Sequence, residues 1–250
     1  MSSNASAQTS GDRKSVRVVL VHGAWADGSS WSKVIALLQT KGINAVAVQL
    51  PLTTLAADVA TVKRAIALQD GPVVLAGHSY GGVVITEAGN DPKVAGLIYV
   101  AAFAPDAGES VGSLGQSYPP APLGAELRPD AEGFLSISPK GFAEDFAQDV
   151  PAKEAKVLWA TQGPTNAAVF GSPVSIAAWK TKPSWFVVAE EDRAIPPALE
   201  KAEAARMKAT TIHQREMGGG SAHVQVLARW PRRRFGRALR EPMPSGLSVR

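Results

Sequence analysis

The sequence predicts an α/β fold, a mostly parallel doubly wound sheet with an inserted helical cap. Short runs that are apolar along their whole length alternate with amphipathic segments over residues 15–104, a pattern typical of strands covered on both faces by helices. The alternation stops over residues 105–184, where prolines cluster, and then resumes. Residues 72–88 combine an apolar run, a turn of small residues around Ser79 and the start of a helix.

The expected elements follow one another in a regular order. A β-branched stretch at residues 15–23 predicts the first strand, and Ser29-Ser30 is the expected N-cap of a helix that closes at Gly42. Right-handed crossovers place the carboxyl ends of parallel strands at one edge of the sheet, where ligands bind. Further strands are expected at residues 43–50, 72–79, 94–104, 184–189 and from 210, and helices at residues 55–68, 81–90 and 197–208.

The predicted domain organisation has four parts. The first residues are polar and serine-rich, without the apolar segment of a signal peptide, so a cytoplasmic location is expected unless an export signal has been removed. The parts are a flexible leader (1–14), the α/β core (15–104 and 185–231), a helical cap insertion (105–184) and an atypical arginine-rich tail (232–250).

Charge and composition argue against several classes of function. Residues 226–250 hold seven arginines and one acidic residue, whereas the whole chain has a net charge of +4. Only Trp230 and Phe235 are aromatic there, too few for a surface that stacks bases, so no nucleic-acid partner is expected. The longest apolar run, residues 94–104, is shorter than the roughly 20 residues of a membrane span. The chain has no cysteine, which excludes disulfides and a cysteine nucleophile.

Ser79 is the candidate nucleophile. It lies in a G-x-S-x-G pattern in which Gly77, Gly81 and Gly82 allow a strand and a helix to approach closely at a tight, strained turn. The N-terminus of the following helix directs backbone N–H groups toward the serine, where negative charge would develop. A serine hydroxyl at this position needs a base, and a carboxylate to orient that base.

The candidate base is one of four histidines. His78 adjoins Ser79 and points to the opposite face of the strand, while His22 ends the first strand and is expected to brace the following loop. His213 falls early in the last strand. His223 lies in a glycine-rich loop after that strand, at the edge where Ser79 is expected, and is therefore the predicted base, with a plain surface histidine as the alternative.

Two aspartates compete for the role of the acid. Asp192 follows the strand at residues 184–189 and precedes a turn, and Asp106 follows the strand at residues 94–104. We favour Asp192, because the chain order Ser79, Asp192, His223 is the one expected for a serine turn between a strand and a helix. The alternative role of Asp192 is that of a turn or helix-capping residue.

The remaining predicted site residues are those expected to contact the substrate. The oxyanion hole requires two converging N–H groups, and those of Tyr80 and of Ala24, in the loop after the first strand, are expected to supply them. Trp25 and Trp159 are tentative substrate-binding residues, although either could only pack. We expect neither a metal nor a cofactor, because the sequence contains no metal-ligand cluster and no phosphate-binding glycine motif.

These motifs resemble the α/β-hydrolase superfamily. The similarity is most specific at V-H-G-A-W (21–25), G-H-S-Y-G-G (77–82), A-A-F-A-P-D (101–106), E-D-R-A-I-P (191–196) and H-V (223–224). Within the superfamily the chain is similar to bacterial esterase-like proteins akin to the plant methylesterase and hydroxynitrile lyase family. The resemblance implies the α/β-hydrolase fold and a triad of Ser79, Asp192 and His223, and it assigns Asp106 to a recurrent structural segment.

Two departures from the family bear on function. Hydroxynitrile lyases typically carry a lysine beside the base, where this chain has Val224, which favours hydrolysis. The family continues after the histidine with a helix of mixed composition, whereas residues 229–240 are rich in arginine. An off-frame reading of a GC-rich gene would give such a composition, a hypothesis that comparison of the coding frames tests.

The predicted function is that of a serine esterase. It would cleave small to medium hydrophobic carboxylic esters through an acyl-enzyme on Ser79, with a small-molecule ester as the expected partner and an oligomeric state that the sequence leaves open. The alternatives are a hydroxynitrile-lyase-like C–C lyase, a cofactor-free perhydrolase or haloperoxidase, and a small-molecule receptor that does not hydrolyse its ligand.

Overall fold

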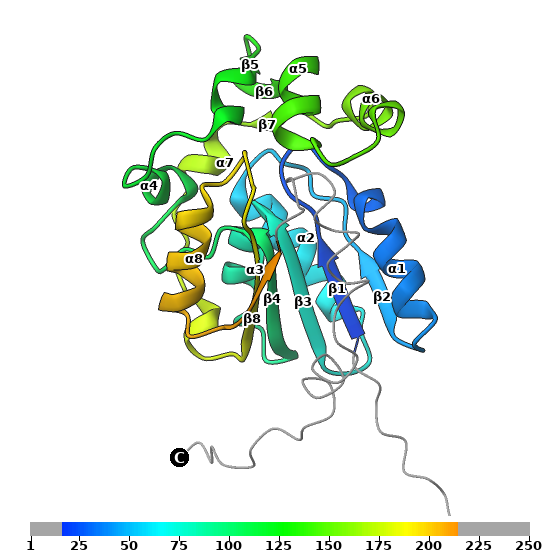
Figure 1. The fold of residues 1–250 in the computed structure, drawn as a ribbon. Coiled ribbons are helices and arrows are strands. Elements are labelled where there is room, and N and C mark those ends of the chain that lie inside the picture. Colours follow the sequence, from blue (N-terminus) through cyan, green and yellow to red (C-terminus); the bar gives the residue numbers. More distant parts are fainter. Residues whose placement is uncertain (1–16, 215–250) are drawn as a thin grey trace, which may run out of the picture.

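The computed structural model describes residues 17–214, and a parallel six-stranded sheet forms the centre of this part of the chain (Figure 1). The strand order is β2-β1-β3-β4-β8-β9, and every neighbouring pair is parallel. The strands are β1 (Arg17–Val21), β2 (Asn44–Ala47), β3 (Val73–Ser79), β4 (Val94–Ala102), β8 (Ser184–Ala189) and β9 (Thr210–Gln214). The predicted α/β class and parallel sheet are therefore confirmed.

The sheet reverses its direction of growth between β1 and β3. The chain passes from β1 outward to β2 and then crosses back to β3 on the other side of β1. Ligands of open α/β sheets bind beside such a switch point, outside the carboxyl ends of the strands. Ser79 ends β3, and the loop from His22 to Asp27 follows β1, so both stand at this point.

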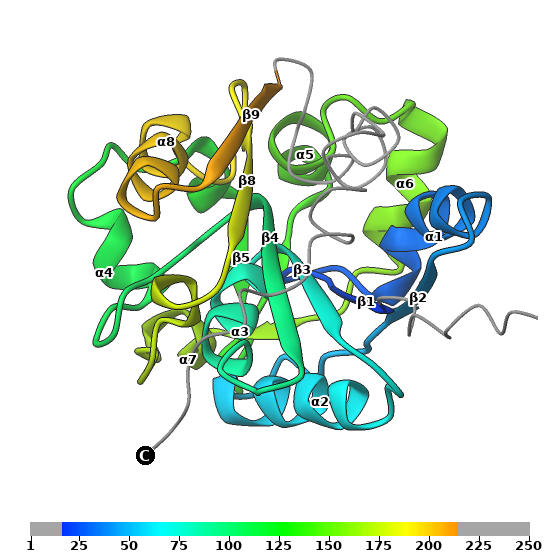
Figure 2. The same ribbon diagram turned by 90° about the horizontal axis from the view of Figure 1, so that it is seen from below.

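Helices cover both faces of the sheet because successive strand residues point to opposite sides. Val18 and Leu20 of β1 pack with Trp31, Val34 and Leu38, which lie on or next to α1 (Ser32–Gln39). The residues of β1 and β3 that point to the other face belong to a second core. This core also contains residues of α2 (Leu55–Ala67), α3 (Gly81–Ala88) and α8 (Pro197–Arg206). Figure 2 shows α1 and α2 on opposite sides of the sheet. No helix within residues 17–214 is long and apolar enough to cross a lipid bilayer.

The start of the first helix differs from the prediction. A 3₁₀ turn, Gly28–Trp31, precedes α1, and its N-cap is Asp27 rather than Ser29-Ser30. The carboxylate of Asp27 accepts the N–H of Ser29 at 2.6 Å, and a charged acceptor satisfies a free N–H at the start of a helix well. The predicted end is correct, because Gly42 takes a positive φ of 69° just after the helix.

The segment between β4 and β8 contains strands as well as helices. Its antiparallel sheet has the order β5-β6-β7, and Figure 1 shows this sheet together with α5 and α6 above the carboxyl end of the large sheet. We call residues 105–183 the cap segment. Its elements are α4 (Val111–Gly115), a 3₁₀ turn (Pro122–Glu126), β5 (Leu127–Pro129), β6 (Phe134–Ile137), α5 (Pro139–Gly141), a π-helical turn (Phe142–Phe146), α6 (Ala152–Ala160), β7 (Thr165–Asn166), α7 (Ala168–Gly171) and a 3₁₀ turn (Ala178–Lys180).

A recognisable turn explains the hairpin of β5 and β6. The side chain of Asp130 accepts the N–H groups of Glu132 and Phe134, and Gly133 takes a positive φ of 80°. Asp and Gly at these spacings are typical turn residues, so the sequence carried a signal for this hairpin that our prediction of a helical cap missed. The predicted domain boundaries stay predictions, and the leader (1–14) and the arginine-rich tail (232–250) lie outside the described residues.

Candidate active site

Ser79 occupies a strained backbone position between β3 and α3. Its φ is 50°, in the left-handed region, which costs a residue other than glycine about 1–3 kcal/mol unless the surroundings impose it. The surroundings are backbone atoms in close contact. A Cβ on Gly77 would lie 2.5 Å from the carbonyl oxygen of Gly81, and one on Gly82 would lie 2.2 Å from that of Phe103. These contacts require glycine and hold the serine at the end of the strand.

The loop after β1 lies directly against Ser79. A Cβ on Gly23 would be 2.8 Å from the Cβ of Ser79. The N–H of Trp25 donates to Thr165 Oγ1 at 3.1 Å, whereas the N–H groups of Ala24 and Tyr80 donate to no group among residues 17–214. The two predicted oxyanion donors are thus each next in sequence to a residue of this contact, Gly23 or Ser79, and their N–H groups have no partner in the described part of the chain.

His22 braces this loop, as expected. Its ring is buried, its Nδ1–H donates to the carbonyl of Gly23 at 2.9 Å, and its Nε2 accepts the N–H of Leu50 at 2.9 Å. Burial lowers the pKa of His22 below its ordinary value, which favours the neutral ring that this pair of hydrogen bonds requires. With both nitrogens in use, His22 is a structural residue.

Asp192 is buried beyond the end of β8. Its Oδ1 accepts the N–H groups of Ala194 at 2.6 Å and Ile195 at 2.9 Å, while its Oδ2 has no partner among the described residues. Burial, and to a lesser degree the charge of Asp149, raises the pKa of Asp192 to about 7. An ionised carboxylate in this place therefore needs a positive or hydrogen-donating partner on Oδ2.

Asp106, the competing acid, has a different environment. Its carboxylate pairs with Lys180 at 2.6 Å, its side chain is 28% exposed, and Lys180 lowers the pKa of Asp106. The ion pair neutralises Asp106 near the surface. Of the two candidates, Asp192 is the one that is buried and has a carboxylate oxygen without a hydrogen-bond partner among the described residues.

The positions of β3 and β8 set the separation of Ser79 and Asp192. Both residues lie at the carboxyl edge of the sheet, and only β4 lies between their strands. Neighbouring strands are about 4.8 Å apart, so the two strand ends are separated by roughly 10 Å.

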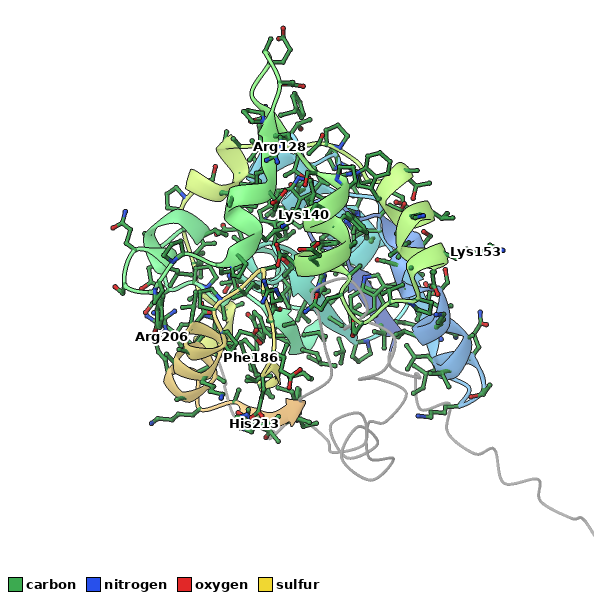
Figure 3. All side chains as sticks on the ribbon, turned by 45° about the horizontal axis from the view of Figure 1, so that its top comes forward. Arg128, Lys140, Lys153, Phe186, Arg206 and His213 are labelled. Atoms are coloured by element: carbon green, nitrogen blue, oxygen red, sulfur yellow. The ribbon has the colours of Figure 1, made fainter. Side chains whose placement is uncertain are left out.

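The predicted base, His223, lies outside the described residues, so its assignment stays a prediction. The other histidines have different environments. His78 is fully buried in β3, and His213 on β9 is exposed, with its Nδ1 3.3 Å from Glu190 Oε1 (Figure 3). Within residues 17–214, His22 bonds to Gly23 and Leu50 and His213 lies beside Glu190, so neither of these two histidines is paired with Ser79 or Asp192.

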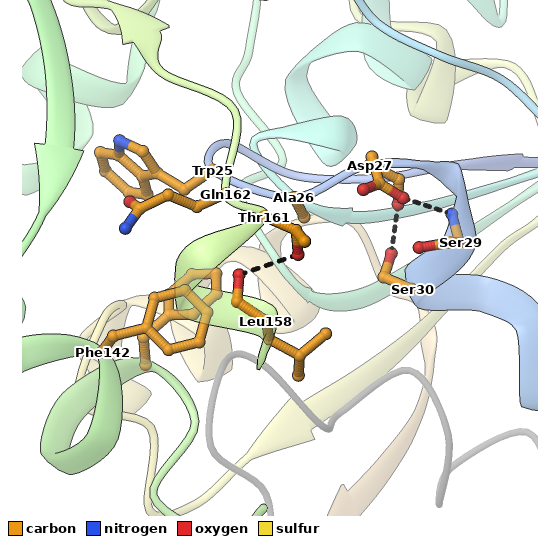
Figure 4. Close-up of a pocket in the computed structure, with 10 residues that line it drawn as sticks. Trp25, Ala26, Asp27, Ser29, Ser30, Phe142, Leu158, Thr161 and Gln162 are labelled. Carbon is orange, nitrogen blue, oxygen red and sulfur yellow. Dashed lines mark hydrogen bonds between the residues drawn. The ribbon is translucent and has the colours of Figure 1, made fainter. Parts of the chain in front are cut away.

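A small, mainly apolar pocket lies beside the loop after β1 (Figure 4). Trp25 belongs to its wall, and its indole N–H donates to the carbonyl of Leu135 at 2.8 Å. Its role in binding substrate stays a prediction. Trp159 is not among the lining residues: its indole N–H donates to the carbonyl of Ile137 at 3.1 Å, and its neighbour Leu158 lines the pocket instead. The lining residues are Trp25, Ala26, Asp27, Ser29, Ser30, Phe142, Phe146, Leu158, Thr161 and Gln162.

Asp58 is a buried residue of the site region that the sequence analysis missed. Tyr80 donates its hydroxyl to Asp58 Oδ2 at 2.8 Å, and Asp58 Oδ1 accepts the N–H of Leu52 at 2.9 Å. Burial raises the pKa of Asp58 above its ordinary value. An acidic residue three positions after Leu55 and four before Val62 lies on the apolar face of α2, and this position was the available signal.

A family model described as the alpha/beta hydrolase family matches residues 18–231. An α/β hydrolase named nvfD from Aspergillus novofumigatus is 29% identical over 208 residues, which cover 73% of this chain and 80% of that protein. A carbendazim hydrolyzing esterase from a Nocardioides species is 35% identical over 112 residues, or 38% of this chain and 46% of the esterase.

Solved structures share the fold at low sequence identity. A pyrethroid hydrolase from Sphingobium faniae has a TM-score of 0.75 at 20% identity, covering 89% of this chain and 97% of its own. Polyneuridine aldehyde esterase has a TM-score of 0.71 at 18% identity, and the match covers 84% of this chain and 94% of the esterase chain. The family model, the parallel sheet and the serine turn lead to one conclusion: the chain belongs to the α/β-hydrolase family, and the predicted enzyme class, hydrolase, is confirmed.

Proposed function

We propose that the protein is a serine carboxylic esterase. The observation that carries this proposal is the backbone of Ser79, held in the left-handed region between β3 and α3, with the loop of Gly23 and Ala24 against it. A structure maintains this strain at a serine when the hydroxyl must project from the sheet toward a substrate.

The proposed reaction is acyl transfer in two steps. His223 takes the proton of Ser79 Oγ as the oxygen attacks the ester carbonyl, and the N–H groups of Ala24 and Tyr80 stabilise the oxyanion. His223 then protonates the leaving alcohol. Water activated by the same histidine hydrolyses the acyl-enzyme, and Asp192 orients the ring and stabilises the imidazolium through its Oδ2.

We propose small to medium hydrophobic esters as substrates, because the pocket beside the loop after β1 is mainly apolar, although Ser79 is not among its lining residues. Trp25, Phe142, Phe146 and Leu158 give it a mainly apolar wall, and such walls bind apolar groups. Two of the similar proteins are named a carbendazim hydrolyzing esterase and a pyrethroid hydrolase, and these names have hydrolysis of a small molecule in common.

The experiment is hydrolysis of p-nitrophenyl esters of increasing acyl length. We expect the wild type to hydrolyse short and medium chains, and S79A to lose about 10⁴–10⁶-fold in kcat, as when a triad nucleophile is removed. The control is S172A, because Ser172 is half-buried and its hydroxyl donates only to the carbonyl of Ala168 within the described residues. Equal rates in S79A and the wild type would exclude the serine mechanism.

A further inference from the structure

Helix α8 carries two buried carboxyl groups that face the ends of strands. Glu200 and Glu203 are 0% and 2% exposed and lie three residues apart on the helix. Glu200 Oε2 accepts the N–H of Ala189 at 2.9 Å, and Glu203 Oε1 accepts the N–H of Ala104 at 2.8 Å. Isolated acidic residues are rarely buried to this degree, because burial removes the water that stabilises their charge. These two side chains therefore require a structural or functional reason.

The residue that Glu200 holds is the one on which the turn of Asp192 closes. Ala189 is the last residue of β8, and its carbonyl accepts the N–H of Asp192 at 3.4 Å. Asp192 then accepts the N–H groups of Ala194 and Ile195, and the chain enters α8. The bond from Glu200 back to Ala189 thus ties the far end of this loop to its beginning.

The charges around Glu200 favour its neutral form. Burial and the negative charges of Asp192 and Glu203 raise the pKa of Glu200 well above its ordinary value, whereas the N–H donated by Ala189 and, less strongly, the charge of Lys201 oppose this shift. Its Oε1 has no acceptor or donor among the described residues. A neutral carboxyl with its proton on Oε1 can still accept the N–H of Ala189 on Oε2. Glu200 can therefore anchor the strand without adding a second negative charge beside Asp192.

We propose that Glu200 is a positioning residue for the triad acid: its hydrogen bond to Ala189 fixes the strand end from which the loop of Asp192 starts. The inference rests on the proposed serine mechanism, in which Asp192 must meet the imidazole of the base with a defined geometry. A displacement of about 1 Å at a catalytic group can cost up to 100-fold in rate. Glu203 makes the same kind of bond from the same helix, but to the segment after β4, and so provides a matched control.

The test is a double-mutant cycle with p-nitrophenyl ester hydrolysis as the readout. Methionine has about the shape of glutamate and accepts no comparable hydrogen bond, so E200M removes the anchor with little change in volume. We expect E200M to lower kcat about tenfold with KM changed less than twofold, and to have less than a twofold effect in the D192N background. We expect E203M to lower kcat by less than threefold in either background.

E200Q is the conservative variant, and it tests whether an uncharged side chain that accepts the N–H of Ala189 is sufficient. E200Q keeps an oxygen for the N–H of Ala189, so we expect its kcat within threefold of the wild type. An equal effect of E200M in both backgrounds would overturn the proposal, and so would a tenfold loss in a folded E200Q. A wild-type rate equal to that of S79A would instead contradict the proposed function, so the two failures are distinguishable.

Discussion

The nucleophile and the acid of the proposed triad are held by different kinds of contact. Ser79 is positioned by backbone packing, in which the glycines at 23, 77 and 82 leave no room for a Cβ. Asp192 is positioned by the hydrogen bonds that the N–H groups of Ala194 and Ile195 donate to its carboxylate. Its loop starts at Ala189, whose N–H donates to the buried carboxyl of Glu200. One site thus combines a rigid steric support for the nucleophile with a hydrogen-bonded support for the acid.

The largest effect is expected where the steric support is broken. A Cβ at residue 82 would lie 2.2 Å from the carbonyl oxygen of Phe103, a backbone atom that cannot move alone. We therefore expect G82A to lose most of its folded protein or to be destabilised by about 3 kcal/mol or more. Urea unfolding followed by circular dichroism measures this effect.

The matched control for G82A is an alanine at a glycine with open space. Gly124 has no atom within 4 Å of an added Cβ and no positive φ. We expect the free energy of unfolding of G124A to lie within about 0.5 kcal/mol of that of the wild type. Equal stability of G82A and G124A would contradict the account of the turn between β3 and α3.

The next effect concerns the acid. D192N retains the size of the side chain and an oxygen for Ala194 and Ile195, but its amide cannot play the part of the carboxylate toward the base. We expect kcat for p-nitrophenyl butyrate to fall about 10⁴-fold, as in other triads.

Asp106 is the comparison for this variant. Its carboxylate pairs with Lys180 near the surface, so D106N is expected to reduce kcat by less than threefold. If D106N is the more damaging of the two substitutions, the assignment of the acid is reversed.

A smaller effect is expected at Tyr80. Y80F removes the hydroxyl that donates to Asp58 Oδ2 and leaves a buried carboxylate oxygen without that donor. We expect a loss of about 1–3 kcal/mol in the free energy of unfolding. Since the proposed oxyanion donor is the backbone N–H of Tyr80, kcat of the folded variant should stay within a few-fold of the wild type. A 100-fold loss of kcat with unchanged stability would contradict this separation.

A further effect is a pH dependence of stability at Glu203. Burial raises the pKa of Glu203 to about 8 in the folded protein, above the ordinary value of 4.5. The unfolded chain loses this proton near pH 4.5 and the folded protein only near pH 8, so the wild type loses stability across this range as the pH rises. E203Q lacks this proton, and its Tm relative to the wild type should therefore increase from pH 4.5 to pH 8. A constant difference in Tm would show that Glu203 does not titrate in this way.

The glycine contacts that support Ser79 could be predicted from the sequence, whereas the hydrogen bond that Glu200 accepts from Ala189 could not. Gly77, Gly81 and Gly82 around a serine indicate a close strand–helix approach by themselves, because only glycine fits there. The bond from Glu200 to Ala189 depends on tertiary packing, and a glutamate in the first turn of a helix is ordinarily a surface residue. The same distinction applies to the fold, since apolar runs predicted the parallel strands but the small β5-β6-β7 sheet was missed.

Covalent labelling tests the central claim most directly. A fluorophosphonate ester reacts with an activated serine hydroxyl, and the expected tryptic peptide 65–93 contains Ser79 as its one serine. We predict stoichiometric modification of that peptide in the wild type, no modification of it in S79A, and loss of ester hydrolysis in proportion to labelling. Complete labelling of another peptide with parallel loss of activity, or full activity after Ser79 is modified, would contradict the account.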